Sequence, residues 1–582
     1  GTTVSTATAD ANGNYSFTGV ADGAYSVTLA KTGIAFTPTS QSVTVDGGNA
    51  TIAAFAATAT ISGTISPAAS GAGTLLVLNG PNLTLSKTAD SSGNYSFTEL
   101  QPGSYTVTPS KTGYTFTPTS RSVTISSQSA TANFTAFAST TNLSVNGAQQ
   151  FQTIDGMGVN INVNSWNNGQ LKPALDFLVA TNGSTLFRVV RDPMDWVASE
   201  TLIPALHALD PTILQQVYEA PKMQDLWNTI GYLNQKGIRG GQIVLNFMGW
   251  TPAWLGGSGS FGVASHITQG KEPEFATMVA SLVYYGRTVK GLDFTYLSPL
   301  NEEDWDCLEG PCVSSTQYRI ILHELAGELN SMGVANVRFV GPETAIIGVS
   351  VSYVFEMLLD STVAGLTDHL ALHDYSNVPV SPGTAYPGKN YWLTETSAVC
   401  STCDEGGGGP PNEWIFATQT YDLTLSDVKN GFAAVLIWDG YDSFWYHHNA
   451  WDLAGFLGYD RIAGLYTPRK RAYANAQLNR FIAPGDIVIG ASESIGSVPS
   501  IVAVYNPATG KVAIVGRNSG SSPITINGQF SNLPVMSTLA LYETSATDNL
   551  SRKGDVVVAG GTFAVQISAD AIFSLTNQPL AE

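Results

Sequence analysis

Two glutamates end apolar segments that have the character of buried parallel strands. Glu302 follows the segment 292–299, and Glu395 follows Tyr391-Trp392-Leu393-Thr394. Barrel enzymes keep their chemistry at the carboxyl ends of such strands. Two carboxyl groups held face to face can protonate a glycosidic oxygen and attack the anomeric carbon, so this pair favours glycosidase chemistry. Glu303 and Asp304 compete with Glu302 for the acid role, and the strand register favours Glu302.

The segments that carry these glutamates belong to a regular alternation of strands with helical patterns. Residues 273–290, 315–332 and 351–359 have apolar side chains at spacings of three and four, as amphipathic helices do. This alternation predicts a (β/α)8 TIM barrel over residues 139–470. Its eight strands are expected at 156–162, 185–191, 241–248, 292–299, 337–342, 368–374, 390–395 and 432–438.

The chain before the barrel contains an internal repeat. Ala11-Asn12-Gly13-Asn14-Tyr15-Ser16-Phe17 returns as Ser91-Ser92-Gly93-Asn94-Tyr95-Ser96-Phe97. Short alternating strands separated by glycine turns predict N-terminal β-sandwich repeats, with a complete module over 59–138. Residues 1–58 lack a counterpart of roughly 60–80, so a partial module is expected there. The repeats contain no histidine and no carboxylate pair, which favours a spacer or a weak glycan binder.

Helical patterns stop near residue 471. Residues 486–577 contain about eight short β segments, which predict a C-terminal β-sandwich over 471–582. A further strand near 141–154 precedes the barrel, and we expect it to complete this sandwich. The short connection 473–484 offers no flexible linker, so the sandwich should pack on the barrel.

Composition limits the class of partner. The 582 residues include 26 basic and 45 acidic side chains, and the net charge of -19 opposes binding to nucleic acid or to an anionic membrane. No apolar run approaches 18 residues, so no membrane insertion is expected. Charged residues form only 12% of the chain while aromatic residues reach 10%, which favours a neutral polymer. The Thr-, Ser- and Gly-rich composition predicts a secreted or cell-surface protein.

The four cysteines form two close pairs in sequence. Cys307 and Cys312 follow the first glutamate strand, and Cys400 and Cys403 follow the second. A zinc site with four thiolate ligands is one interpretation, but the knuckle spacing is incomplete, and an exported chain favours disulfides. The connectivity stays open at this stage. No metal and no organic cofactor is predicted for the chemistry.

Several motifs together resemble those of retaining (β/α)8 glycosidases and, within that clan, glycoside hydrolase family 30. The resemblance extends from about residue 141 to residue 582, and the preceding repeats resemble carboxypeptidase-regulatory or prealbumin-like modules. Glu303 stands where the family usually has a proline. The motifs are Phe151-Gln152-Thr153-Ile154-Asp155-Gly156-Met157-Gly158, Leu186-Phe187-Arg188-Val189, Trp250-Thr251-Pro252-Ala253-Trp254, Ser298-Pro299-Leu300-Asn301-Glu302, Thr394-Glu395 and Phe481-Ile482-Ala483-Pro484-Gly485.

The resemblance implies a role for each residue of the site. Glu302 would be the acid/base and Glu395 the nucleophile, with their carboxyl groups about 5–5.5 Å apart. Asn301 would hydrogen-bond the 2-hydroxyl of the sugar. Arg188 would keep Glu395 ionised, although a structural ion pair with Asp155 or Asp192 explains it equally well.

Further residues are expected to bind the substrate. His373 and Tyr375 end the sixth strand, and Trp438 ends the eighth, where its ring can stack on a pyranose. Trp250 belongs to the third-strand motif, and Trp445 lies in an aromatic loop over 441–451 that we interpret as a binding wall. Either a substrate contact or a helix cap explains Glu343. His447 and His448 suggest a metal only weakly, because neighbouring side chains rarely point the same way.

These observations predict a secreted retaining glycoside hydrolase that acts on a β-linked neutral polysaccharide or its oligosaccharides. Two alternatives stay open. One is an exo-acting glycosidase or a transglycosylase of the same clan, and the other is a non-catalytic carbohydrate-binding surface protein. The N-terminal modules would then attach the chain to a cell surface or to a polysaccharide.

Overall fold

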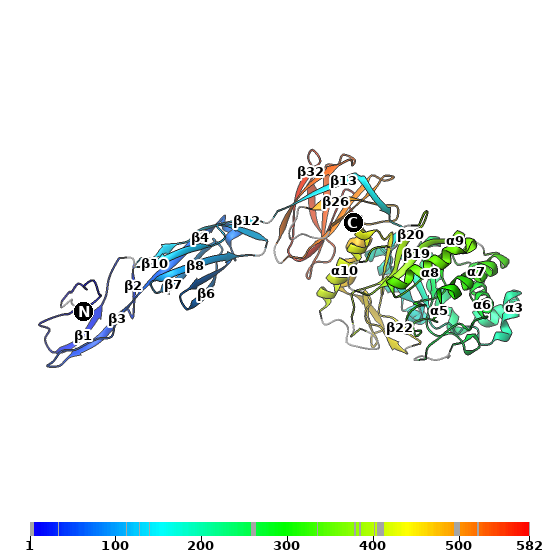
Figure 1. The fold of residues 1–582 in the computed structure, drawn as a ribbon, viewed down its shortest axis with the longest axis horizontal. Helices are drawn as coiled ribbons and strands as arrows, with labels where there is room; N and C mark the ends of the chain where they lie inside the picture. The colour runs from blue at the N-terminus through cyan, green and yellow to red at the C-terminus, as the bar shows by residue number, and fades with distance from the viewer. Residues whose placement is uncertain are drawn as a thin grey trace. The chain divides into compact units, whose positions relative to one another are not determined.

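The chain divides into two compact units, drawn in Figure 1. One comprises Gly1–Thr140 with Gly520–Ile524, and the other comprises Thr141–Ser519 with Thr525–Glu582. A computed structural model describes residues 5–32, 34–111, 113–126, 128–138, 140–257, 263–334, 336–376, 380–382, 386–400, 402–403, 412–447, 449–493, 501–520 and 523–580.

The two N-terminal repeats share the same local geometry. In the first, β1 (Gly23–Thr28) pairs antiparallel with β3 (Ser40–Val45), and Gly23 lies opposite Val45. In the second, β8 (Gly103–Ser110) pairs with β10 (Arg121–Ile125), and Gly103 lies opposite Ile125. The registers are therefore equivalent in the two copies. The turn before each pair also agrees, because Asp10 and Asp90 each accept two backbone N–H groups from residues two and four positions later.

Only the second repeat buries a core of its own. Its strands form a four-stranded sheet, β10-β8-β5-β6, and a six-stranded sheet built on β4 that also recruits β2 (Ala35–Thr37). Ile61, Phe97 and Val107 are fully enclosed between them. No described residue in 5–55 is buried. The remaining strands are β4 (Ala56–Ser66), β5 (Leu75–Gly80), β6 (Leu83–Thr88), β7 (Asn94–Leu100), β9 (Tyr114–Thr117), β11 (Ala130–Thr131) and β12 (Phe134–Ala138).

Eight parallel strands close into a barrel in the second unit, which confirms the predicted fold class. Each strand overlaps one predicted segment. The strands are buried on both faces, because helices cover the outside and side chains fill the inside, as parallel sheets require. In order they are β14 (Gly156–Asn162), β15 (Leu186–Arg191), β16 (Ile243–Phe247), β17 (Tyr296–Ser298), β18 (Arg338–Val340), β19 (Thr367–Asp374), β20 (Asn390–Thr396) and β21 (Ala434–Ile437).

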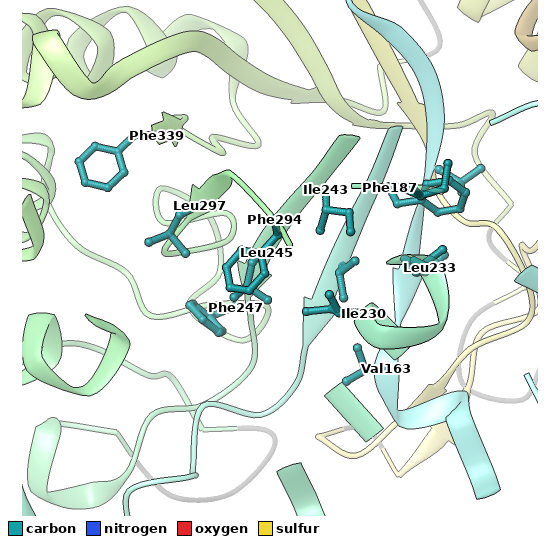
Figure 2. Close-up of a cluster of buried hydrophobic side chains, with 14 of the residues drawn as sticks. Val163, Phe187, Ile230, Leu233, Ile243, Leu245, Phe247, Phe294, Leu297 and Phe339 are labelled. Carbon is teal, nitrogen blue, oxygen red and sulfur yellow. The ribbon is translucent and has the colours of Figure 1, made fainter. Parts of the chain in front are cut away.

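Helices pack against the barrel through large apolar side chains. Figure 2 shows Ile230 and Leu233 of α5 (Pro221–Gln235) beside Phe187 of β15 and Ile243 of β16. The predicted helices correspond to α6 (Glu272–Tyr284) with the helical turn that follows it, α7 (Ser315–Ser331) and α8 (Ile347–Leu359). No described helix has both the length and the apolar character needed to cross a membrane.

The C-terminal strands form one nine-stranded sheet, in the order β31-β30-β33-β28-β27-β26-β13-β29-β32. The strand before the barrel, β13 (Thr140–Thr153), lies inside this sheet between β26 and β29. The end strands β31 and β32 are joined by residues 558–561 alone, so the sheet must curl back on itself. The remaining strands are β26 (Ile487–Glu493), β27 (Ile501–Asn506), β28 (Lys511–Asn518), β29 (Ile524–Ser531), β30 (Thr538–Thr544), β31 (Ser551–Val557), β32 (Thr562–Ile567) and β33 (Ala571–Thr576).

Two helices join the sheet to the barrel. On α10 (Glu413–Asn430), Trp414 donates to Asp570 at 2.7 Å and Tyr421 donates to the Gly516 carbonyl at 3.2 Å. On α11 (Lys470–Asn479), the buried Gln477 donates to Thr544 at 3.0 Å. Several apolar side chains of the sheet, such as those of Val502 and Ile572, belong to the same buried cluster as the barrel residues. Barrel and sheet therefore share one core.

We expect residues 139–582 to fold as a soluble protein without the repeats, whereas residues 139–470 should be insoluble. The shorter chain loses α11 and strands β26–β33, which leaves β13 and the sheet-facing side of α10 without their apolar partners. Soluble yield and far-UV circular dichroism of the two chains measure this difference. A soluble, folded protein ending near residue 470 would contradict the shared core.

Candidate active site

The two glutamates lie at the carboxyl ends of β17 and β20. Glu395 is part of β20, while Glu302 follows β17 in a turn where its φ is +43°. Few non-glycine residues adopt this left-handed conformation without support. Here the Glu302 N–H donates to the Glu343 carbonyl, and the Glu302 carbonyl accepts from the Trp305 N–H, both at 3.0 Å. These two bonds hold the turn that places Glu302 in the barrel mouth.

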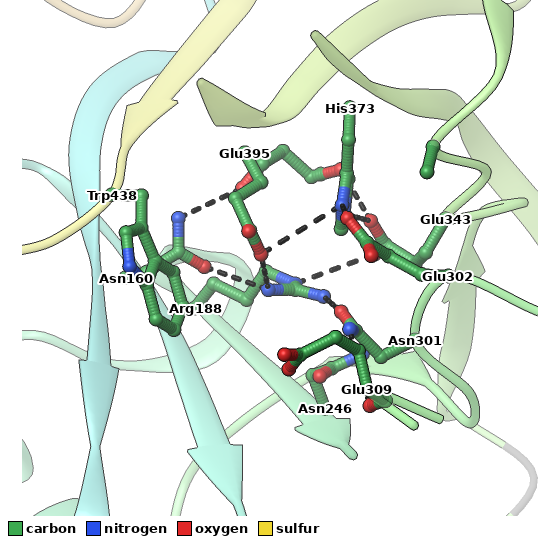
Figure 3. Close-up of polar contacts among 12 residues, drawn as sticks. Asn160, Arg188, Asn246, Asn301, Glu302, Glu309, Glu343, His373, Glu395 and Trp438 are labelled. Atoms are coloured by element: carbon green, nitrogen blue, oxygen red, sulfur yellow. Dashed lines mark hydrogen bonds and ion pairs between the residues drawn. The ribbon is translucent and has the colours of Figure 1, made fainter. Parts of the chain in front are cut away.

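The carboxyl groups of Glu302 and Glu395 face each other across His373 (Figure 3). One oxygen of each glutamate and one ring nitrogen of His373 all lie within 4.8 Å of one another. The His373 Nδ1 atom is 3.1 Å from Glu302 and 3.8 Å from Glu395. The nearest oxygens of the two carboxyl groups are thus close enough for both groups to contact one glycosidic bond.

Arg188 is the buried cation of this site. Its side chain on β15 is completely enclosed and donates to Glu395 at 2.9 Å, to Asn160 at 2.8 Å, and to Asn301. Its Nε atom lies 3.6 Å from Glu343. Arg188 therefore pairs with Glu395 and Glu343, and neither Asp155 nor Asp192 is its partner. A buried guanidinium needs such compensation, because an unpaired charge in the core is strongly destabilising.

His373 links the acidic groups and carries a positive charge at neutral pH. Burial lowers the pKa of the imidazole, but Glu395 and the hydrogen bonds to Glu302 and Glu343 outweigh this effect and raise it to about 10. Glu343 accepts from His373 at 2.9 Å and also from Thr394. Burial opposes its ionisation, yet Arg188 and His373 lower its pKa to about 2. Glu343, which the sequence left between a substrate contact and a helix cap, thus anchors the two buried cations.

Glu302 has the pKa of a group that can exchange protons near neutrality. Burial raises the pKa of its carboxyl to about 7, with a smaller rise from Glu395, while the charge and hydrogen bond of His373 hold it down. The neighbouring acids are occupied elsewhere. Glu303 is buried and accepts the Glu343 N–H at 3.2 Å, and Asp304 accepts the N–H groups of Ala345 and Ile346. Of these three acids, only Glu302 lines the open cleft.

The carboxyl pair opens into a cleft of about 900 Å³. Aromatic and acidic side chains line it, and the lining residues that the structure describes include neither lysine nor arginine. Trp438 and Trp445 stack at 5.0 Å between ring centroids, and Tyr375 donates to Glu395 at 2.9 Å. Trp250 is absent from the described lining and packs edge-on against His447, so the structure does not bring it to the cleft. The acids in the lining are Glu302, Asp306, Glu309, Asp374, Glu395 and Asp452.

Both cysteine pairs form disulfides within their own loops. Cys307 is bonded to Cys312 and Cys400 to Cys403, which confirms disulfides and settles the connectivity that the sequence left open. With all four sulfur atoms in disulfides, no thiolate is left to bind zinc in this form of the protein. Each disulfide closes the loop that follows one of the two glutamates.

The sequence motifs assigned no role to Asn160 or to the side chain of Thr394. Asn160 donates to the Thr394 carbonyl at 3.0 Å and accepts from Arg188, and Thr394 itself binds Glu343. An asparagine in the otherwise apolar run of β14 was the available signal, because a buried polar group needs a partner. The buried His447 pairs with Asp192, away from the carboxyl pair, and His448 lies outside the described residues.

Comparison with known proteins supports the fold. Residues 60–138 match a family described as BOS complex subunit NOMO1-like, second beta sandwich domain. No curated protein sequence matches the chain.

Among the solved structures with a similar fold, three illustrate the likeness, and each aligns with 75% of this chain. The glycoside hydrolase family 30 subfamily 8 xylanase Xyn30A from Clostridium acetobutylicum has a TM-score of 0.57, 20% identity and 99% of its own length covered. The catalytic domain of GH30 xylanase C from Talaromyces cellulolyticus has a TM-score of 0.58, 17% identity and 99% covered. The endo-beta1,6-glucanase BT3312 has a TM-score of 0.54, 13% identity and 93% covered.

We predict that replacing His373 by glutamine raises the pKa of the Glu302 carboxyl above about 7. The substitution removes the imidazolium charge and hydrogen bond that stabilise the ionised form, so the protonated form persists to higher pH. Carbon-13 NMR titration of glutamate-labelled protein measures the change. The matched control is His369→Gln, because His369 is bound to Tyr296 and Asn390 instead. An unchanged or lower Glu302 pKa in the His373 variant would contradict the assigned network.

Proposed function

We propose that this protein is a secreted, retaining glycoside hydrolase that cleaves β-glycosidic bonds of a neutral polysaccharide or its oligosaccharides. The observation that carries the proposal is the carboxyl pair of Glu302 and Glu395, which share one cleft and have one oxygen of each within 4.8 Å of the other. A non-catalytic binding protein has no need of a buried acid with a pKa of about 7 beside a second carboxylate.

The mechanism assigns a separate task to each glutamate. Glu395, paired with Arg188, attacks the anomeric carbon and forms a covalent glycosyl-enzyme. Glu302, protonated near neutral pH, gives its proton to the departing oxygen and later takes one from the attacking water. Tyr375 donates to the oxygen of Glu395 that Arg188 does not bind, so both nucleophile oxygens are held in place. Two successive inversions retain the β configuration of the sugar.

Other residues bind and orient the sugar. Asn301, fixed through its bond to Arg188, is assigned to the 2-hydroxyl, and the Trp438 ring is assigned to a pyranose face. Trp445 supports the Trp438 ring from behind. His373 is assigned mainly to the carboxyl groups that it contacts. Trp250 packs away from the cleft, so its contribution is to support this wall.

The absence of lysine and arginine from the described lining supports a neutral substrate, because an acidic polysaccharide would meet six carboxyl groups there and no basic side chain of either kind. Two of the structural neighbours are described as xylanases and one as an endo-beta1,6-glucanase, whose printed description names a β linkage. Secretion is supported by the two disulfides, which persist in oxidising compartments. We assign the N-terminal modules to spacing or to attachment at a surface.

The two glutamates should respond differently to removal of their charge. Glu395→Gln is expected to lower turnover by several orders of magnitude on every substrate, because no covalent intermediate can form. Glu302→Gln should still form the glycosyl-enzyme from aryl glycosides with good leaving groups, and azide should restore turnover as a β-glycosyl azide. Kinetics with and without azide, and NMR of the first product, measure both outcomes. Inverted product, or rescue in Glu303→Gln instead, would contradict the assignment.

The pH dependence should follow the protonated form of Glu302. For an unactivated oligosaccharide, kcat/KM is expected to fall as the pH rises through about 7, because the acid loses its proton. For a dinitrophenyl glycoside, whose leaving group needs no proton, this decline should be absent. If kcat/KM fell at the same pH for both substrates, the role of Glu302 as the acid would be contradicted.

A further inference from the structure

Trp305 is unusual among the tryptophans of this chain. All 11 lie within the described ranges, and Trp305 alone is exposed, with 55% of its surface accessible. Among the described residues, its indole N–H donates no hydrogen bond and its ring stacks on no other aromatic side chain. An aromatic ring left open to water at the edge of a cleft has apolar surface to offer a ligand, since covering it is favourable.

The backbone holds Trp305 at a defined position relative to Glu302. The Trp305 N–H donates to the Glu302 carbonyl at 3.0 Å, which closes a tight turn. Two residues later, the Cys307–Cys312 disulfide closes the rest of the loop, and the Cys312 sulfur lies 3.6 Å from the Trp305 carbonyl. The ring is therefore carried by the same constrained loop as the acid.

Trp305 lies on one side of the carboxyl pair, and the stacked Trp438 and Trp445 lie on the other. Trp305 follows β17, whereas Trp438 and Trp445 follow β21, four positions away in the closed barrel of eight strands. In Figure 3, Trp438 and Glu302 lie on either side of Glu395. All three tryptophans line the same cleft. A chain that stacks on Trp438 and passes over the carboxyl pair therefore continues toward Trp305.

We propose that Trp305 forms the leaving-group subsite, where its ring stacks on the sugar that departs. The proposal rests on the proposed function, in which Glu302 protonates the departing oxygen. The acid must lie beside the leaving group, and Trp305 is the exposed aromatic residue on its loop. The pyranose ring presents apolar C–H groups on its face, which pack on an aromatic surface as other apolar groups do. The same subsite would bind an acceptor sugar that replaces water in the second step.

The role of this subsite can be measured separately with a glycosyl donor whose leaving group is not a sugar. A β-glycosyl fluoride of the preferred sugar loads the glycosyl-enzyme without occupying the subsite, because only fluoride departs. An added β-methyl glycoside then competes with water for the glycosyl-enzyme, and the ratio of transfer to hydrolysis reports its binding. We expect Trp305→Ala in the full chain to lower this ratio about tenfold, with fluoride hydrolysis unchanged. The kcat/KM for an oligosaccharide should fall by a similar factor.

Two further variants make the test specific. Trp305→Phe keeps an aromatic face and should retain most of the transfer. Phe355→Ala is the matched control, because Phe355 on α8 is 57% exposed and is not among the cleft-lining residues, so its ratio should equal that of the wild type. The Cys307→Ser, Cys312→Ser variant should lower the ratio as well. Adding Trp305→Ala to it should cause little further loss, since both changes act through one ring.

The outcomes separate the two proposals. If the wild type turns over no glycosyl fluoride, the proposed function fails. If it does and Trp305→Ala leaves the transfer ratio unchanged, the subsite assignment is wrong. A loss of fluoride hydrolysis in Trp305→Ala equal to the loss with oligosaccharide would also overturn it, because Trp305 would then act on the donor sugar.

Discussion

The compensation of one buried charge organises the centre of this barrel. Arg188 has no access to water, so its guanidinium depends on Glu395, Glu343 and the amide oxygens of Asn160 and Asn301. These partners come from β14, β20 and the loops after β17 and β18. Removing one partner of a buried ion pair typically costs roughly 3–5 kcal/mol. The same contacts that stabilise the cation therefore connect the ends of five strands, namely β15 and the four that carry its partners.

His373, the second buried cation, affects the carboxyl groups around it. His373 is held in its charged form by three glutamates, and with Arg188 it faces Glu343 and Glu395. Two positive charges are then balanced by two negative ones, which leaves the third glutamate, Glu302, free to be protonated near neutral pH. The pKa of Glu302 is thus governed mainly by burial, while Glu395 lies against the Arg188 guanidinium.

The sheet domain contributes to this site through the frame of the barrel. The chain passes through β13 in the middle of the nine-stranded sheet before it forms β14, which carries Asn160. The helix that leaves the barrel, α11, is buried against the same sheet through Gln477 and its neighbours. The chain segments that enter and leave the barrel are thus both packed into one sheet. The pairing of β14 with β21, which closes the barrel, is therefore supported by contacts outside these two strands.

Local patterns determined much of this structure in advance. Short apolar runs located the eight barrel strands, and apolar side chains at spacings of three and four located the helices, because burial dictates both patterns. The repeat followed from matching turns, and the two glutamates were recognisable because each ends a buried strand. The hydrogen-bond and ion-pair partners within the site could not be predicted from local patterns. Asn160, Arg188, Glu343 and Glu395 are far apart in sequence, so their contacts arise only when the barrel closes.

Tertiary structure likewise decided between alternatives that the sequence left open. The sequence offered Asp155 and Asp192, which are near Arg188 along the chain, as its ion-pair partners. In the closed barrel Arg188 pairs with Glu395 instead. The turn after β17 sent Glu302 into the cleft and left Glu303 in the core, although the two are neighbours and chemically identical. Spacing along a strand constrains the face on which a side chain lies. Only the assembled fold determines which charged group lies opposite that side chain. Nearby charge and burial then set the pKa of a titratable group.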